Sequence, residues 1–96
     1  MVDEASPLEW DEAKSLKNRR ERGFGFEVAS EIFQGPVLEL EDQRRDYGER
    51  RFLAIGQVEE NFLAIVYTWR GARRRVISAR RAKRGKRDAY RQAYPG

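Results

Sequence analysis

The chain of 96 residues contains no cysteine and no histidine. The absence of cysteine excludes disulfide frameworks, thiolate metal sites and cysteine nucleophiles. The absence of histidine excludes Ser-His-Asp catalysis and any acid–base chemistry at an imidazole. Catalysis by this sequence must therefore use Arg, Lys, Tyr, Glu or Asp.

Long apolar runs are also missing. No uncharged stretch approaches the ~20 residues that cross a bilayer, and the acidic first eleven residues do not resemble a secretory signal. With 40% hydrophobic and 11% aromatic residues, the sequence is rich enough in apolar side chains to fold. We expect a single small domain over residues 1–96, located in the cytoplasm and not in a membrane.

The basic residues are concentrated towards the C-terminus. Twenty Lys and Arg against sixteen Asp and Glu give a formal charge of +4, but residues 70–96 alone hold eleven basic residues and one acid. A block of this density attracts polyanions such as nucleic acid. A solvated basic helix and tail is the alternative that these residues leave open.

Hydrophobic periodicity and turn residues predict an α+β fold. Two N-terminal helices are expected from Asp11 to Gly23 and over residues 26–33, strands over 37–41, 51–58, 62–69 and 73–80, and a C-terminal helix over 82–94. Short turns between strands favour a four-stranded, mostly antiparallel sheet. We expect the helices to cover one face of this sheet and the other face to hold the function.

Acidic residues gather around the first predicted strand and the loop that follows it. They are Glu39, Glu41, Asp42, Asp46 and Glu49. Carboxylates can hold a hard cation, but this spacing matches no cation-binding loop. We interpret the cluster as a solvated strand edge and predict neither a metal site nor a cofactor.

The strongest chemical signal is a set of arginines and one tyrosine on the last three predicted strands. The set comprises Arg51, Tyr67, Arg70, Arg73, Arg75, Arg80 and Arg81. Guanidinium groups bind phosphate oxygens in pairs and stabilise the charge of a pentavalent phosphorus transition state. The residues alone leave two functions open, a basic binding surface without catalysis and RNA cleavage by clustered cations.

Several segments resemble the BrnT family of type II toxins, in the same order and at similar spacing. The most specific are residues 10–14, with the pattern Trp-Asp-x-x-Lys, and residues 75–80, with the pattern Arg-x-Ile-Ser-Ala-Arg. The resemblance covers nearly the whole chain and extends over residues 8–14, 18–23, 26–29, 49–56, 66–68 and 75–82.

This resemblance implies a RelE-like fold and a metal-independent ribonuclease that inhibits translation, with RNA as its substrate. It implies that the partner is a DNA-binding ribbon-helix-helix antitoxin like BrnA. It also leaves open that two toxin chains form a dimer in the complex with the antitoxin. Attack by the 2′-hydroxyl on the adjacent phosphate would use Glu49 or Tyr67 as base. The expected catalytic residues are Glu49, Arg51, Tyr67 and Arg80. The expected RNA-binding residues are Lys14, Arg70, Arg73, Arg75 and Arg81.

The chain departs from the family pattern at three polar positions. Arg22, Trp69 and Lys86 stand where many relatives carry histidine, an acidic residue and glutamate. Guanidinium stays protonated at neutral pH, so Arg22 cannot replace a histidine that transfers protons. The alternative functions are therefore a non-catalytic RNA-binding or ribosome-associated module, and a partner protein whose basic tail binds an acidic protein.

Overall fold

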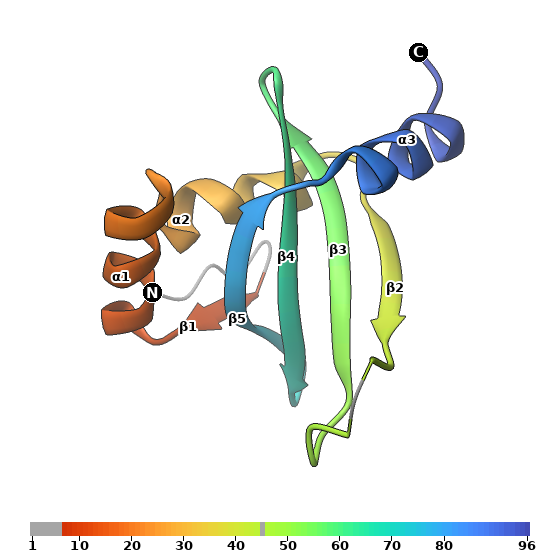
Figure 1. Cartoon of the computed structure of the whole chain (residues 1–96). Coiled ribbons are helices and arrows are strands. Elements are labelled where there is room, and N and C mark those ends of the chain that lie inside the picture. The colour runs from red at the N-terminus through yellow and green to blue at the C-terminus, as the bar shows by residue number, and fades with distance from the viewer. Residues whose placement is uncertain (1–6, 45) are drawn as a thin grey trace.

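A computed structural model describes residues 7–44 and 46–96, which form a five-stranded sheet with helices on both faces (Figure 1). The elements in chain order are β1 (Leu8–Trp10), α1 (Glu12–Arg22), α2 (Phe26–Ala29), the 3₁₀ helix η1 (Ser30–Gln34), β2 (Leu38–Asp42), β3 (Arg51–Val58), β4 (Asn61–Arg70), β5 (Arg73–Arg81) and α3 (Arg84–Ala93). Among the described residues, no helix is both long and apolar enough to span a membrane.

The strand order in the sheet is β1-β5-β4-β3-β2. Strands β2 to β5 pair antiparallel with their neighbours, which confirms the predicted antiparallel part. The predicted number of strands was wrong, because β1 adds a fifth strand that pairs parallel with β5 and makes the sheet mixed. Three residues are too few for a hydrophobic alternation to indicate a strand, so no local pattern predicted β1.

The helix boundaries follow local capping chemistry. The Asp11 carboxylate accepts a hydrogen bond from the backbone N–H of Ala13 at 2.8 Å and begins α1 as predicted. Gly23, at a φ of 89°, ends α1 in the left-handed conformation that glycine adopts without a steric penalty. The second predicted helix is divided into α2 and η1, and its buried residues Phe26, Ala29 and Ile32 follow the three-residue period of a 3₁₀ turn.

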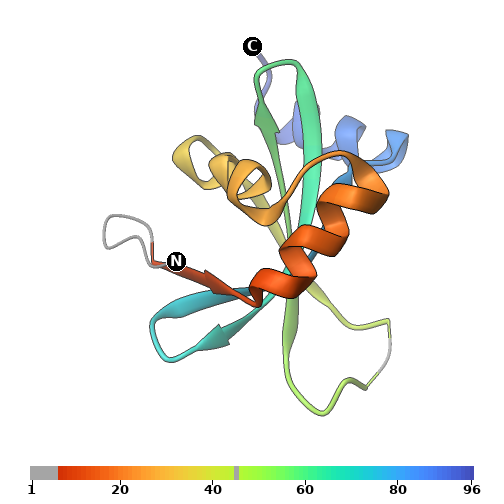
Figure 2. The ribbon, with the colours of Figure 1, turned by 90° about the vertical axis from the view of Figure 1, so that its left-hand side faces the viewer.

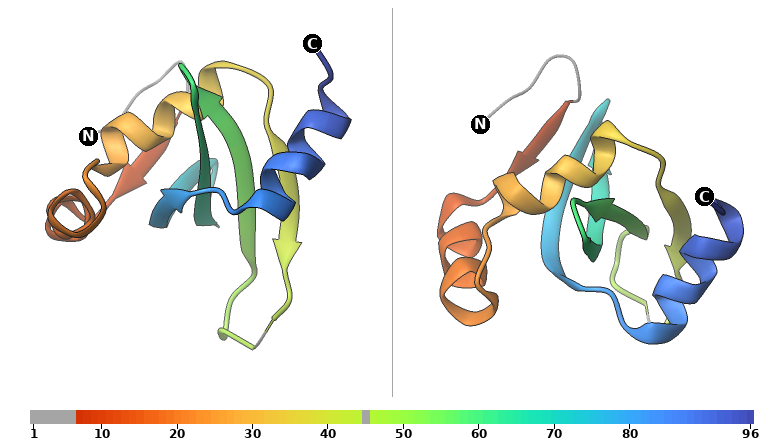
Figure 3. Two further views of the ribbon diagram at one scale, coloured as in Figure 1. Left: turned by 45° about the horizontal axis from the view of Figure 1, so that its top comes forward. Right: turned by 90° about the horizontal axis from the view of Figure 1, so that it is seen from above.

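The helices lie on both faces of the sheet, which corrects the expectation that one face is bare. Helices α1, α2 and η1 lie on one side, and α1 follows β1 at the sheet edge (Figure 2). Helix α3 crosses one end of the opposite side (Figure 3). We call the side with α1, α2 and η1 the covered face, and the side with α3 the open face, because much of it beyond α3 carries no helix (Figure 1).

Two apolar clusters correspond to these two faces. The larger one, on the covered face, packs Phe26 and Ile32 against Ile65 and Tyr67 of β4 and Val76 of β5, all at most 2% exposed. The smaller one, on the open face, packs α3 onto the sheet and comprises Ile55, Ala64, Ala82 and Tyr90. The hydroxyl of Tyr90 also donates a hydrogen bond to the carbonyl of Pro36 at 3.0 Å. Together these contacts fix the position of α3 over the ends of the strands.

Candidate functional site

A β-bulge in β5 decides which arginines share a face. Residues 66 and 67 of β4 pair with residues 78 and 76 of β5, so Ile77 is an extra residue in that strand. Strict alternation would place Arg80 on the face opposite to Arg73 and Arg75. The extra residue reverses the alternation after Ile77, and all three arginines therefore lie on the open face.

Beyond α3, two rows of side chains run across the strands of the open face, and the paired residues Arg70 and Arg73 lie beyond them at the β4–β5 turn. The first row is largely apolar and comprises Leu40, Leu53, Val66 and Ser78, each paired with the next in register. The second row is polar and contains the paired residues Asp42 and Arg51, and the paired residues Thr68 and Arg75. The open face thus places an apolar strip beside a strip of charged groups.

A pocket with a volume of about 160 Å³ opens above the apolar row. Leu40, Leu53 and Val66 line it, together with Arg80 of β5 and Lys86 in the first turns of α3. Residues 41–44, at the end of β2, complete the lining. The pocket therefore combines an apolar surface with positively charged groups from β5, from α3 and from the segment after β2, where Arg44 lies.

Three cations on or beside this face have no charge partner among the residues that the structure describes. The side chains of Arg73, Arg80 and Lys86 make no ion pair or hydrogen bond with any of residues 7–44 and 46–96. Arg80 and Lys86 are exposed, and the Nη1 atom of Arg73 is buried without a hydrogen-bond partner in that part of the chain. Arg80 and Lys86 are therefore available to an anionic ligand, whereas Arg73 is partly buried and has no charge partner in the described part of the chain.

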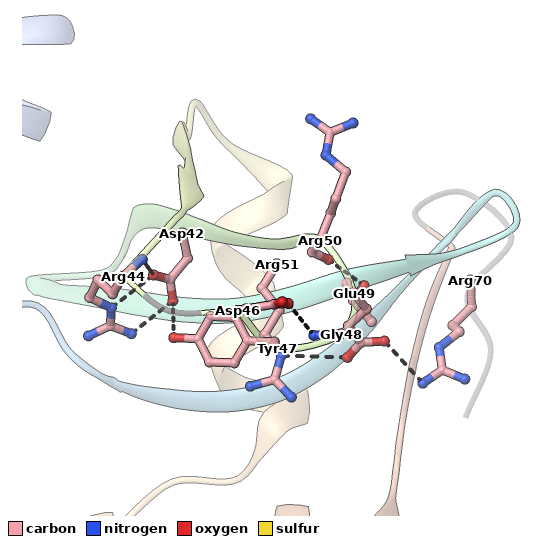
Figure 4. Close-up of polar contacts among 10 residues, drawn as sticks. Asp42, Arg44, Asp46, Tyr47, Gly48, Glu49, Arg50, Arg51 and Arg70 are labelled. Carbon is pink, nitrogen blue, oxygen red and sulfur yellow. Dashed lines mark hydrogen bonds and ion pairs between the residues drawn. The ribbon is translucent and has the colours of Figure 1, made fainter.

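A second charged cluster lies at the far end of the face, in and beside the loop between β2 and β3 (Figure 4). The Glu49 carboxylate lies between Arg51, at 3.5 Å, and Arg70, at 3.8 Å. The guanidinium of Arg51 also stacks on the ring of Tyr47, with 4.2 Å between its central carbon and the ring centroid. Glu49 remains about one-third exposed, so at least part of its carboxylate faces solvent.

The loop is held to β2 by Asp42. Both oxygens of this carboxylate accept hydrogen bonds from the Arg44 guanidinium at 2.8 Å, and Oδ2 also accepts one from the Tyr47 hydroxyl at 3.1 Å. The hydrogen bonds from Arg44 hold the pKa of the Asp42 carboxyl well below its usual range. Asp42 therefore stays ionised at neutral pH and orders the loop rather than exchanging protons.

Four of the five acidic residues that were expected at a solvated strand edge pair with basic residues in the structure. Glu39, Glu41, Asp42 and Glu49 each form an ion pair with an arginine, and Asp46 accepts a hydrogen bond from the backbone N–H of Gly48. Within the described ranges, no group of three or more acidic side chains is arranged to hold a metal ion. The cluster therefore orders the strand ends and the loop.

Six of the nine expected site residues lie on or beside the open face. They are Glu49, Arg51, Arg70, Arg73, Arg75 and Arg80. Arg75 is partly neutralised there, because it binds Glu9 of β1 at 2.7 Å. Lys86 and Arg44 also line the pocket but were not among the expected residues, since neither lies on a predicted strand.

The structure does not bring Tyr67 to this group. Tyr67 is 2% exposed on the covered face, and its hydroxyl donates a hydrogen bond to Glu39 at 2.7 Å. Burial, and then the hydrogen bond to Glu39, raise the pKa of Tyr67. The structure therefore places Tyr67 and Arg80, which were expected to line one site, on opposite faces of the sheet.

Lys14 and Arg81 are also separated from the open face. Lys14 is exposed on α1, on the other side of the sheet. Arg81 pairs with Leu63 on the covered face and donates a hydrogen bond to Asn61 at 2.8 Å. The nine expected site residues are thus divided between the two sides of the sheet.

The fold and this face define a small α+β protein with a surface suited to a polyanion. Over residues 10–85 the chain matches the ribonuclease toxin BrnT of type II toxin-antitoxin systems, and it therefore belongs to the BrnT family. Membership implies ribonuclease activity, RNA as substrate and a cognate antitoxin as partner. A search of curated proteins gave no match. The matched range includes the six expected residues on the open face.

Proposed function

We propose that the chain is an endoribonuclease toxin that cleaves RNA without a metal ion and so inhibits translation in the cytoplasm. The observation that carries this proposal is the placement of unpaired Arg73, Arg80 and Lys86 on the same side as Glu49 and Arg51. A single-stranded polyanion lying across this side would neutralise cations that have no partner in the described chain.

The reacting phosphate lies over β4 in this proposal, between Arg80 of β5 and Arg51 of β3. Strand spacing and rise place the Cα atoms of these two arginines about 16 Å apart, so their long side chains approach the phosphate from opposite sides. The 2′-hydroxyl attacks the adjacent phosphorus, and both guanidinium groups stabilise the charge that develops on the non-bridging oxygens. The bond between phosphorus and the 5′-oxygen breaks, and the leaving 5′-oxygen takes a proton from solvent water, so the products are a 2′,3′-cyclic phosphate and a free 5′-hydroxyl.

Glu49 is the proposed general base. It is a partly exposed carboxylate on the open side, held by Arg51 and Arg70 at 3.5 and 3.8 Å. Tyr67, the other candidate, is buried on the opposite face, where its hydroxyl donates a hydrogen bond to Glu39. Catalysis by the remaining groups therefore relies on Glu49 for proton removal and on arginines for charge stabilisation.

In the proposed complex, the RNA strand continues from the reacting phosphate towards the β4–β5 turn and the first residues of β5. Arg70 and Arg73 are paired across the β4–β5 turn, and Arg75 follows on the same side. Each phosphate that such residues neutralise steepens the salt dependence of binding by somewhat less than one unit of slope. Arg73 is expected to contribute more than Arg75, because Glu9 already neutralises Arg75.

The proposed antitoxin is a DNA-binding ribbon-helix-helix protein of the BrnA kind, and a toxin dimer in the complex is an additional proposal. The strongly basic C-terminal segment and the unpaired cations of the open face favour an acidic surface on such a partner. Co-expression of the neighbouring small reading frame, followed by purification of the pair and measurement of its mass, tests both points.

The test of the catalytic proposal uses labelled RNA in excess EDTA. Arg80→Ala is expected to lower the cleavage rate by roughly 10²–10³-fold, the usual effect of removing one charge-stabilising donor. Arg20→Ala is the matched control, because Arg20 is exposed on α1 without a partner among the described residues. Products must carry 2′,3′-cyclic or 3′-phosphate ends. Cleavage that EDTA abolishes, or that survives Arg80→Ala unchanged, would refute the proposal.

A second candidate function is RNA binding without cleavage. It is favoured by the presence of Arg22 where many relatives carry histidine. The position of Tyr67 on the covered face, away from the arginines of the open face, also favours it. Intact RNA together with salt-sensitive binding in the same assay would establish this alternative.

A further inference from the structure

The pocket above the apolar row shares Arg80 with the cleavage chemistry proposed above, but that chemistry leaves the apolar part of its lining unused. Its lining includes Leu40, Leu53 and Val66, which are adjacent in register on three neighbouring strands. Leu40 is 41% exposed although charged groups surround it. Unlike a single exposed leucine, these three side chains form one contiguous apolar surface in a pocket, which indicates contact with a ligand that has an apolar face.

The volume of the pocket limits the size of the ligand that can fill it. Its volume of about 160 Å³ is close to that of an engineered protein cavity of ~150 Å³ that binds benzene. One aromatic ring system therefore fills it, whereas the drug-sized ligands of typical sites occupy roughly 300–1,000 Å³.

The charge around the pocket restricts the ligand further. Arg80, which holds the reacting phosphate in the proposed function, also lines the pocket, and Lys86 lies beside it. A ligand that fits must join a planar ring to an anionic group a short distance away. A nucleotide has this structure, because its sugar joins the base to the phosphate.

We propose that the pocket is a subsite for one nucleobase of the RNA, next to the reacting phosphate. This inference rests on the proposed function, in which RNA crosses the open face. The base lies on Leu40, Leu53 and Val66, towards β2, while its phosphate lies over β4 within reach of Arg80.

The polar rim gives the subsite a preference among bases. The two carboxylates there are already engaged, since Asp42 binds Arg44 and Glu41 binds Arg50 at 2.9 Å. The Gln43 amide can both donate and accept, whereas the charged groups that remain are donors, namely the unpaired ammonium of Lys86 and the exposed side of the Arg44 guanidinium. Donors favour the keto oxygens of guanine and uracil over the exocyclic amines of adenine and cytosine.

The test measures binding rather than cleavage. Fluorescence anisotropy follows the binding of labelled 2′-O-methyl hexanucleotides, which have no free 2′-hydroxyl, with an abasic site placed at each position in turn. Leu40→Ala removes part of the apolar lining, and Leu16→Ala is its matched control. Leu16 lies on α1 on the covered side and is 48% exposed, so the two substitutions remove the same atoms at similar exposure.

For the unaltered protein and for Leu16→Ala, we expect the abasic site to weaken binding about tenfold at one position. For Leu40→Ala, the loss at that position should fall below about twofold. At the same position, guanine or uracil should bind at least threefold more tightly than adenine or cytosine. A flat abasic scan, or equal behaviour of Leu40→Ala and Leu16→Ala, would overturn the subsite.

The cleavage assay and the abasic scan together distinguish failure of the base subsite from failure of the proposed function. Cleavage of RNA with a flat abasic scan retains the ribonuclease and removes the base subsite. Base-dependent binding without cleavage of ordinary RNA retains the subsite and removes the catalytic proposal. Thermal unfolding of both leucine variants, followed by circular dichroism, verifies that each is folded.

Discussion

The hydroxyl of Tyr67 donates a hydrogen bond to Glu39 at 2.7 Å, and the same carboxylate oxygen binds Arg74 at 2.9 Å. The three residues come from β4, β2 and β5, so this contact links the middle of the sheet to strands on both sides. The Arg74 guanidinium lies over the rings of Phe33 and Trp69, at 4.5 and 4.8 Å from their centroids. We conclude that Tyr67 belongs to a structural cluster on the covered face.

Tyr67→Phe is therefore expected to affect stability and not cleavage. The variant loses a hydrogen bond to a charged group, which contributes about 1–2 kcal/mol to the free energy of unfolding. Glu39 remains paired with Arg74, so no carboxylate is left without a partner. Urea unfolding should show the loss of stability, while the cleavage rate stays within about twofold. A rate loss of tenfold or more in a stably folded variant would return Tyr67 to the catalytic set.

Arg22 also makes a structural contact, which joins the end of α1 to β5. Its Nη1 atom donates a hydrogen bond to the carbonyl of Ala79 at 2.9 Å, on a part of β5 that lies beyond the pairing with β1. Arg22→Ala is expected to lower the free energy of unfolding by about 1 kcal/mol, because this edge carbonyl loses its partner. Arg20→Ala, two residues earlier on α1, is the control and should change stability little. Equal midpoints of urea unfolding for the two variants would contradict this role.

Gly56 marks the closest approach between the sheet and η1. A Cβ atom at this position would lie 2.6 Å from the Cβ of Ile32 and 3.3 Å from a methyl group of Val37. Gly56→Ala is therefore expected to destabilise the protein by about 1–3 kcal/mol through overpacking. Gly85 lies in α3. Gly85→Ala is the contrasting variant, because outside its chain neighbours and its own helix backbone no described atom lies within 4 Å of the added methyl group. It should be neutral or should stabilise by up to about 1 kcal/mol, and thermal unfolding measures both. If Gly56→Ala were as stable as the original chain, the close approach would be wrong.

Local signals predicted much of the fold. Asp11 and Gly23 mark the ends of α1 because capping and left-handed termination are decided by nearby residues. Strands β3, β4 and β5 were predicted with nearly the observed bounds, since their apolar and β-branched residues recur between clear turns. The parallel strand β1 depends on a distant partner, and nothing within its three residues indicated it.

The candidate site was harder to predict because its composition depends on the bulge at Ile77. The sequence identifies a group of arginines in β5, but their division between faces follows from the register with β4. The same limit applies to Tyr67, whose hydroxyl suggested chemistry while its register placed it in the core. Lys86 reaches the pocket only because α3 packs across the open face, which requires contacts far apart in the chain.

Asp42 gives the protein a predictable dependence on pH. Its hydrogen bonds from Arg44 lower its pKa in the folded state below the ordinary value of 3.8. A depressed pKa contributes stability that is fully present well above pH 3.8 and is lost as the pH falls through that value towards the lower folded one. Asp42→Asn cannot ionise, so it should unfold at a lower temperature than the original chain at pH 7. The difference should shrink steadily once the pH falls below about 4.

The control for this measurement is Glu41→Gln. Glu41 pairs with Arg50, and its pKa is also lowered by hydrogen bonding to that guanidinium. The Asp42 side chain is 4% exposed, whereas that of Glu41 is 30% exposed, so water screens the second pair more strongly. Thermal unfolding between pH 7 and pH 2.5 should therefore show a larger pH-dependent difference for Asp42→Asn than for Glu41→Gln. A difference for Asp42→Asn that stays constant over this range would mean that ionisation of Asp42 does not stabilise the fold.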